Sequence, residues 1–202
     1  MRYIKNLCLI ILFSGVVFSL FPEMLHAQND PFDAQFYAQK SQDLQKKGMI
    51  LLGSWATLNI LSGAGGYFLS ENETKYLHQM NAGWNLVNLG ISGFALYGIS
   101  QMDASVLSYS ESLEKLQNFD KILLFNAGLD VGYMAAGAWM WERGIRNDSQ
   151  RLEGYGKSLI LQGGFLLVFD LVLYSLHSPL TNDLIQLSDQ FELTASGFRI
   201  HF

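Results

Sequence analysis

Cysteine, proline and charged residues are all scarce in this sequence. The chain has one cysteine, Cys8, and 3 prolines among its 202 residues, and Asp, Glu, Lys and Arg together make up 15%. Soluble domains contain about a quarter charged residues, so this composition is unusual for them. The formal net charge of −5 also provides no basic surface, which argues against nucleic acid as a partner.

The first 27 residues have the pattern of a secretory signal peptide. Arg2 and Lys5 are positively charged, residues 7–21 are apolar, and Ala27 stands at a plausible cleavage site. Because Cys8 lies within the apolar part, the chain that remains after cleavage has no cysteine, which excludes disulfides and thiol catalysis. The expected organisation is a signal peptide, a helical bundle and an external tail, at residues 1–27, 28–180 and 181–202.

Half of the residues are hydrophobic, and they gather in four stretches of membrane length. A helix rises 1.5 Å per residue, so about 20 residues cross a hydrocarbon core of about 30 Å. Polar residues interrupt each stretch, which favours helices that turn their polar sides toward one another and away from lipid. We therefore predict an all-α fold, an antiparallel bundle of four transmembrane helices. The four stretches are 48–67, 82–100, 122–141 and 158–176.

The first and third helices are expected to extend beyond the membrane on the same side. The polar segment 33–47 runs into the first stretch without a break, and 104–120 precedes the third. Ser108 and Glu111 have the spacing of a capping box in the latter segment. The fourth helix is expected to end at Pro179.

Export fixes the orientation of the helices. The N-terminus and the tail are expected in the periplasm, and the connections 70–75 and 143–157 in the cytoplasm. Arg143, Arg146 and Arg151 cluster in the second connection, as the positive-inside rule requires of a short cytoplasmic loop. The sequence thus predicts a multi-pass protein of a bacterial inner membrane.

Each predicted helix presents one polar or small face, because residues at i, i+4 and i+7 share a side. Amides between membrane helices commonly hold the helices together, whereas carboxyl groups at membrane depth often mark ion paths or ligand sites. Asp130 and Asp170 are expected within about one helical turn of each other in depth, protonated or sharing a proton. Asn59 and Asn88 are expected in the layer beneath. The candidate polar core comprises Asn59, Asn85, Asn88, Asn126, Asp130, Tyr133, Gln162 and Asp170.

The chain contains no sequence motif of a known catalytic or metal site. His78 and His177 are predicted at opposite ends of the bundle, and there is no His-x-x-x-His pair, Gly-x-Ser-x-Gly motif or P-loop. We therefore expect no catalytic residue, no metal and no cofactor. Gly128, Gly132 and Ala136 form a ridge of small residues, which is compatible with close helix packing or with a homodimer.

Three motifs within 35–180 carry a resemblance to a known family. They are Met-Asn-Ala-Gly-Trp-Asn at 80–85, Leu-Asp-Val-Gly-Tyr at 129–133 and Trp-Glu-Arg-Gly at 141–144. Together with the signal segment and the tail ending Gly-Phe-Arg-Ile-His-Phe, they resemble a family of small four-helix inner-membrane proteins of Bacteroidetes-type bacteria. That family has no assigned activity, so the resemblance implies the architecture alone.

The expected function is that of a non-enzymatic membrane protein that contacts lipid, a second copy of itself or another membrane protein. The alternative is a small proton- or ion-coupled transporter that uses Asp130 and Asp170. A third possibility, an enzyme acting on lipid, has no recognisable nucleophile. A cavity reaching both aspartates from one side would favour the carrier, and a solid core with every amide paired would favour the structural protein.

Overall fold

The computed structural model describes residues 34–189, 191–194 and 197–200. The predicted signal peptide and its cleavage site lie outside these residues. The chain divides into two compact units, Met1–Phe32 and Asp33–Phe202, and all described residues belong to the second. This unit contains α2 (Ala34–Leu69), α3 (Asn72–Gln101), a 3-10 turn η1 (Ala104–Val106), α4 (Tyr109–Arg146) and α5 (Gln150–Asp189), followed by β1 (Phe191–Thr194) and β2 (Gly197–Ile200).

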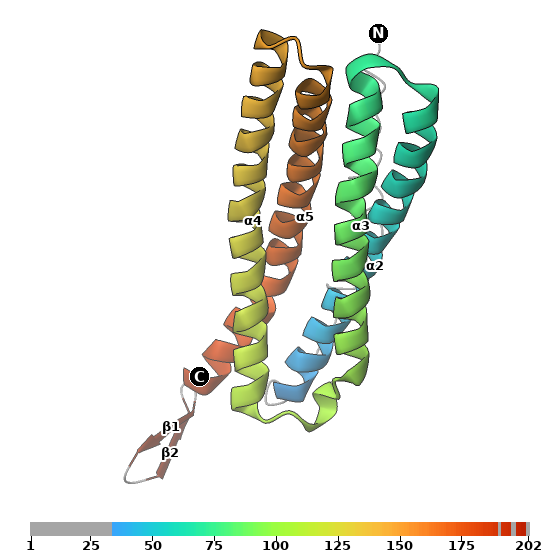
Figure 1. The fold of residues 1–202 in the computed structure, drawn as a ribbon. Helices are drawn as coiled ribbons and strands as arrows, with labels where there is room; N and C mark the ends of the chain where they lie inside the picture. Colours follow the sequence, from blue (N-terminus) through green and yellow to red (C-terminus); the bar gives the residue numbers. More distant parts are fainter. Residues whose placement is uncertain (1–33, 190, 195–196, 201–202) are drawn as a thin grey trace. The chain divides into compact units, whose positions relative to one another are not determined.

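The four helices form two antiparallel hairpins, α2–α3 and α4–α5, as Figure 1 shows. The hairpins meet mainly through α3 and α5, with smaller contacts of α2 with α4 and α5. No extensive contact joins α3 to α4, which stand on the same side of the bundle. The expected all-helical bundle is confirmed. The described part of the tail is not helical: β1 and β2 pair as antiparallel strands, with Phe191 opposite Ile200.

Local sequence signals account for most helix ends. The polar segment before residue 48 and the first apolar stretch form one helix, α2, as predicted. The capping box at the start of α4 is confirmed, because the Ser108 side chain accepts from the Glu111 backbone and the Glu111 carboxylate accepts from the Ser108 backbone. Asn72 is the first residue of α3, and Asp148 lies in the turn between α4 and α5. Their φ values are 52° and 51°, in the left-handed region of backbone conformation that Asn and Asp tolerate better than most residues.

The prediction of a loop over 143–157 is wrong. α4 continues to Arg146 and α5 begins at Gln150, so only three residues separate the helices. The glycines within this segment serve helix packing. A Cβ on Gly144 would lie 2.5 Å from the Glu153 backbone nitrogen of α5, and a Cβ on Gly156 would lie 2.5 Å from the Gly137 carbonyl oxygen of α4. Gly128 and Gly132 have no atom within 4 Å of such a Cβ, so their ridge faces away from the bundle.

The expected end of the fourth helix at Pro179 is also wrong, because α5 runs through this proline to Asp189. Proline deprives the carbonyl of Ser175 of its helical donor, and α5 bends in its last part (Figure 1). The turns beyond the bend are held by packing, since Leu180 and Leu184 form a buried cluster with Leu116 of α4. Tertiary contact here outweighs the local signal.

Among the described residues, α4 and α5 are the two helices long and apolar enough to cross a membrane. The sequence predicts that α2 and α3 cross as well, but these two helices are not apolar enough by the same test of length and mean hydropathy. Their hydropathy is lowered by the Gly, Ser and Asn residues through which they contact each other and α5, such as Asn81, Asn85 and Ser92 of α3, which are buried.

Candidate functional site

An amide network ties α2, α3 and α5 together. The Asn81 Nδ2 atom donates to the Asn59 Oδ1 atom over 2.9 Å, and the Gln162 side chain of α5 donates to Asn81. Asn85 donates to the Asn81 carbonyl over 2.8 Å, and Asn88 donates to the Asn85 side chain. Asn59 of α2 therefore lies beside Asn81 of α3, and not in a layer with Asn88 as expected. The chain reverses at residues 70–71, which brings Asn59 against the tenth residue of α3.

Asp130 of α4 and Asp170 of α5 face each other across the closest helix pair. Both are buried, at 3% and 5% exposure, and their carboxyl groups are near enough to interact electrostatically. Two buried carboxylates at such close range would repel each other if both were ionised, which favours a proton on one of them. The Oδ2 atom of Asp130 has no hydrogen-bond partner.

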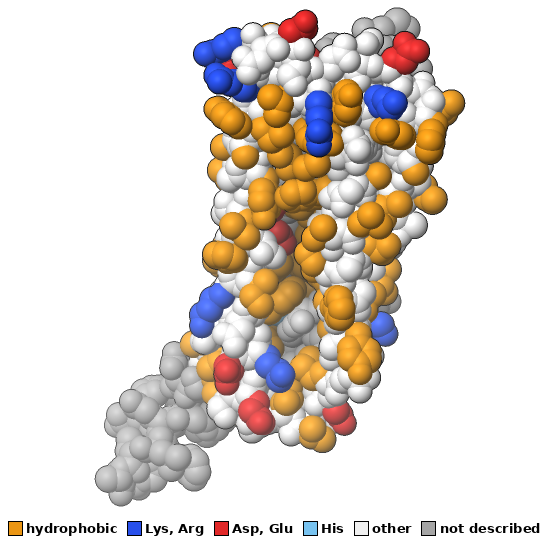
Figure 2. Space-filling model, viewed as in Figure 1, with side chains coloured by type: hydrophobic (Ala, Val, Ile, Leu, Met, Phe, Trp, Pro, Cys, Tyr) orange, Lys and Arg blue, Asp and Glu red, His pale blue; other side chains and the backbone are white. Residues whose placement is uncertain are grey.

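A cavity of about 580 Å³ lies between α3 and α4, with Asp130 and Asp170 in its wall. We call it the α3–α4 cavity. Figure 2 shows a hollow between these helices, with acidic atoms inside it. Most of its lining is apolar, including Val87, Ile91 and Leu123, and Asn88, Asn126 and Tyr133 add polar groups. Such a volume is typical of small-molecule sites. The candidate core is thus not solid: of its eight members, Asn88, Asn126, Asp130, Tyr133 and Asp170 line a cavity.

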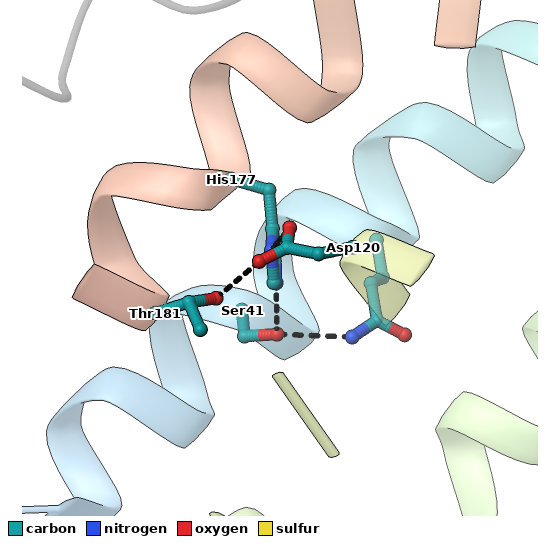
Figure 3. A network of polar contacts seen from close by, with 5 residues as sticks. Ser41, Asp120, His177 and Thr181 are labelled. Carbon is teal, nitrogen blue, oxygen red and sulfur yellow. Dashed lines mark hydrogen bonds and ion pairs between the residues drawn. The ribbon is translucent and has the colours of Figure 1, made fainter. Parts of the chain in front are cut away.

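A second polar cluster lies where α2, α4 and α5 meet, and we call it the His177 cluster (Figure 3). The Ser41 Oγ atom lies 2.7 Å from His177 Nε2, and His177 Nδ1 lies 2.7 Å from Asp120 Oδ1. Thr181 donates to the other Asp120 oxygen over 2.6 Å, and Gln45 donates to the Ser41 hydroxyl over 3.0 Å. A neutral histidine satisfies both contacts when it donates from Nδ1 to the Asp120 carboxyl oxygen and accepts a hydrogen bond from the Ser41 hydroxyl at Nε2.

The sequence alone did not reveal this cluster. Ser41, Asp120 and His177 are separated by 57 to 136 positions, and no fixed spacing marks them. One signal was present: all three belong to helix ends expected beyond the same membrane boundary. Gln45 and Thr181 each lie four residues after a cluster member on the same helix, which places the two side chains of each pair on one face.

The described residues contain no group of three or more His, Cys, Asp or Glu side chains that could hold a metal ion.

The fold and the site define an all-α four-helix bundle with an apolar cavity and two buried polar clusters. Residues 51–171 match a family of unknown function, DUF6992, and the chain belongs to this family. The matched region includes Asp130, Asp170 and Asp120 but not Ser41 or His177. No curated protein and no solved structure matches the chain significantly.

Proposed function

We propose that the chain is an integral membrane protein in which all four helices cross the bilayer. On the face drawn in Figure 2, exposed apolar side chains lie between two ends that carry the charged residues. The exposed apolar side chains of the protein include Phe68, Phe94, Phe125 and Trp139, each at least 64% exposed. Water-soluble monomers rarely expose apolar patches larger than a few hundred Å². Only 22% of the apolar window of α4 is buried, which is far less than a core helix of a soluble protein would bury.

The α2–α3 hairpin is less apolar than α4 and α5, but its helices are long enough to cross and carry no charge over that length. α2 and α3 have 36 and 30 residues, about 54 and 45 Å at 1.5 Å per residue, which exceeds a core of about 30 Å. No Asp, Glu, Lys or Arg occurs in 48–70 or in 76–102. Their amides bond to one another and to α5, so few polar groups of these helices need face lipid. An inner-membrane location with periplasmic termini follows from the predicted export signal.

The function that this arrangement favours is the binding of a lipid's apolar chain in the α3–α4 cavity. The observation that carries the proposal is the cavity itself, an apolar space of about 580 Å³ between two helices that do not pack on each other. In a bilayer, such a space is bordered by lipid, so acyl chains can enter it sideways. A proton on one of the two buried carboxyl groups, Asp130 or Asp170, leaves this pair with less charge in an apolar wall.

Two glycines of α3 provide a matched test. A Cβ on either Gly98 or Gly93 would meet nothing within 4 Å, but only Gly98 lines the cavity. We expect Gly98→Phe to reduce the lipid that copurifies with the protein in mild detergent, measured by native mass spectrometry, and Gly93→Phe to leave it unchanged. Equal lipid retention by the two variants would refute the proposal.

A second candidate function is proton- or cation-coupled transport by Asp130 and Asp170. It is favoured by the cavity, which both aspartates line, and by the unpaired Asp130 Oδ2 atom, which can accept a proton or contact a cation. Proton flux into liposomes that is lost in both Asp130→Asn and Asp170→Asn, with folding preserved, would support transport. Absence of flux in the unaltered protein would exclude proton transport under the conditions of the assay.

A further inference from the structure

We propose that Ser41, His177 and Asp120 form a nucleophilic serine centre that hydrolyses an ester whose acyl chain lies in the α3–α4 cavity. The substrate class rests on the function proposed above, whereas the reactive serine rests on the His177 cluster alone. A nucleophilic serine requires a base within hydrogen-bonding reach and a third group that orients this base. The two distances of 2.7 Å supply both contacts.

Each side chain of the cluster has one chemical role. His177 Nε2 accepts the Ser41 proton and is the general base. Asp120 is a positioning residue, since its carboxylate holds the Nδ1 proton and stabilises the imidazolium that forms during attack. Thr181 positions Asp120 through its second oxygen. The His177 side chain is completely buried, so its contacts with Ser41 and Asp120 are shielded from bulk solvent in this arrangement.

Gln45 connects the serine to the cavity. Its side-chain amide donates to Ser41, and the same residue lines the cavity. Phe119 also connects the cavity to the His177 cluster, since it lines the cavity and packs edge-on against His177 with ring centroids 4.8 Å apart. Ser41 is only 2% exposed, so attack on a substrate requires the Gln45 amide to turn away from the hydroxyl. An amide N–H beside the nucleophile can then donate to the oxyanion of the tetrahedral intermediate.

The location of the cluster suits an ester of a membrane lipid. Lys47 and Lys121 are the last basic residues before the apolar stretches 48–67 and 122–141, and Ser41 and Asp120 lie on the polar side of these two lysines. His177 contacts both Ser41 and Asp120, so it lies at the same level. The polar interfacial layers of a bilayer begin where its hydrocarbon core ends, and the ester groups of lipids lie at that border. An acyl chain within the cavity would thus bring its carbonyl carbon to the end at which Gln45 and Phe119 lie.

The reaction proceeds in two balanced steps. In the first, the Ser41 Oγ atom bonds to the acyl carbon, the hydroxyl proton passes to His177 Nε2, and the alcohol leaves with that proton as the ester C–O bond breaks. In the second, water attacks the acyl carbon and gives its proton to Nε2. The bond between the acyl carbon and Ser41 Oγ breaks, the serine recovers the proton, and a carboxylic acid is released.

Covalent labelling of the full-length protein by a short-chain alkyl fluorophosphonate tests the reactive serine directly. The Ser41 oxygen would bond to phosphorus with loss of fluoride, and peptide mass analysis would locate the adduct. Ser112 is an internal control, because it is also fully buried and its hydroxyl has no hydrogen-bond partner. We expect labelling of Ser41, faster at higher pH and slowed at least about 100-fold by His177→Gln. Labelling of Ser41 no faster than Ser112 would overturn the proposal and leave a buried structural cluster.

A long-chain fluorophosphonate separates this proposal from the function on which its substrate class rests. Faster labelling of Ser41 by the long chain than by the short one is expected, with the preference lost in Gly98→Phe and kept in Gly93→Phe. Labelling by both reagents without any effect of Gly98→Phe would support the serine centre and refute the acyl-binding cavity. Failure of both reagents to label Ser41 would overturn the serine centre, whether or not lipid binds in the cavity.

Discussion

The close packing of α4 on α5 predicts opposite effects for alanine at two glycines of this hairpin. An alanine Cβ at Gly137 would lie 2.8 Å from the Gly156 carbonyl oxygen, 2.9 Å from Leu159 Cβ and 3.0 Å from Ile160 Cγ1. The first of these atoms belongs to the backbone of α5, so the helices must separate. Gly164 is the control, because its Cβ would meet nothing within 4 Å.

The size of the difference follows from two terms. Both substitutions gain about 1 kcal/mol of helix propensity, and this gain cancels between them. Overpacking at Gly137 costs about 1–3 kcal/mol, which at about 2–4 °C per kcal/mol separates the unfolding midpoints by about 2–12 °C. Thermal unfolding in one detergent, followed by circular dichroism, measures the difference, with Gly137→Ala the less stable variant. Equal midpoints would refute the close contact between α4 and α5.

Three further predictions concern the carboxyl pair, the topology and the outer ridge. Asp170→Leu should destabilise the protein by about 1–3 kcal/mol more than Asp170→Asn, because only Asn retains a polar partner for Asp130; equal denaturation midpoints would argue against the pair. Cysteine at Ser105 should react with an impermeant thiol reagent in intact spheroplasts and cysteine at Ser149 should not, and the reverse pattern would contradict the proposed orientation. Gly132→Leu should reduce any homodimer seen by light scattering while preserving the helical content, whereas an unchanged dimer would show that this ridge is not its contact surface.

The parts of the fold that were predictable from sequence depend on local signals. The capping box at Ser108 and Glu111 involves residues three positions apart, and the continuous α2 requires only the absence of a helix breaker. Pro179 shows the limit of such signals, because it favours a helix end that the packing of Leu180 and Leu184 on Leu116 prevents. The expected connection over 143–157 is wrong for the same reason, since Gly144 and Gly156 pack against a neighbouring helix, which a local pattern does not specify.

The sequence predicts which residues of the candidate site lie together only where their depth along the helices decides it. Asp130 and Asp170 are expected at similar depth, and both are buried and line the same cavity. Asn59 bonds to Asn81 and not to Asn88, because the pairing of side chains depends on how α2 and α3 pack, which depth along each helix does not specify. The pairing of Ser41 with His177 depends on the rotation of three helices about their axes and on the bend in α5, which no local pattern specifies.

The central claim, that an acyl chain occupies the α3–α4 cavity, is tested most directly by crosslinking in a bilayer. The protein would be reconstituted with phosphatidylcholine that carries a photoactivatable group within its acyl chain, and the crosslinked residues would be mapped by mass spectrometry. Val87 lines the cavity while its neighbour Leu86 does not, although the two are similarly exposed, at 61% and 60%. The account predicts strong crosslinking at Val87, Ile91 and Leu123, with loss at these positions in Gly98→Phe. Crosslinking at Leu86 equal to that at Val87, unchanged by Gly98→Phe, would contradict it.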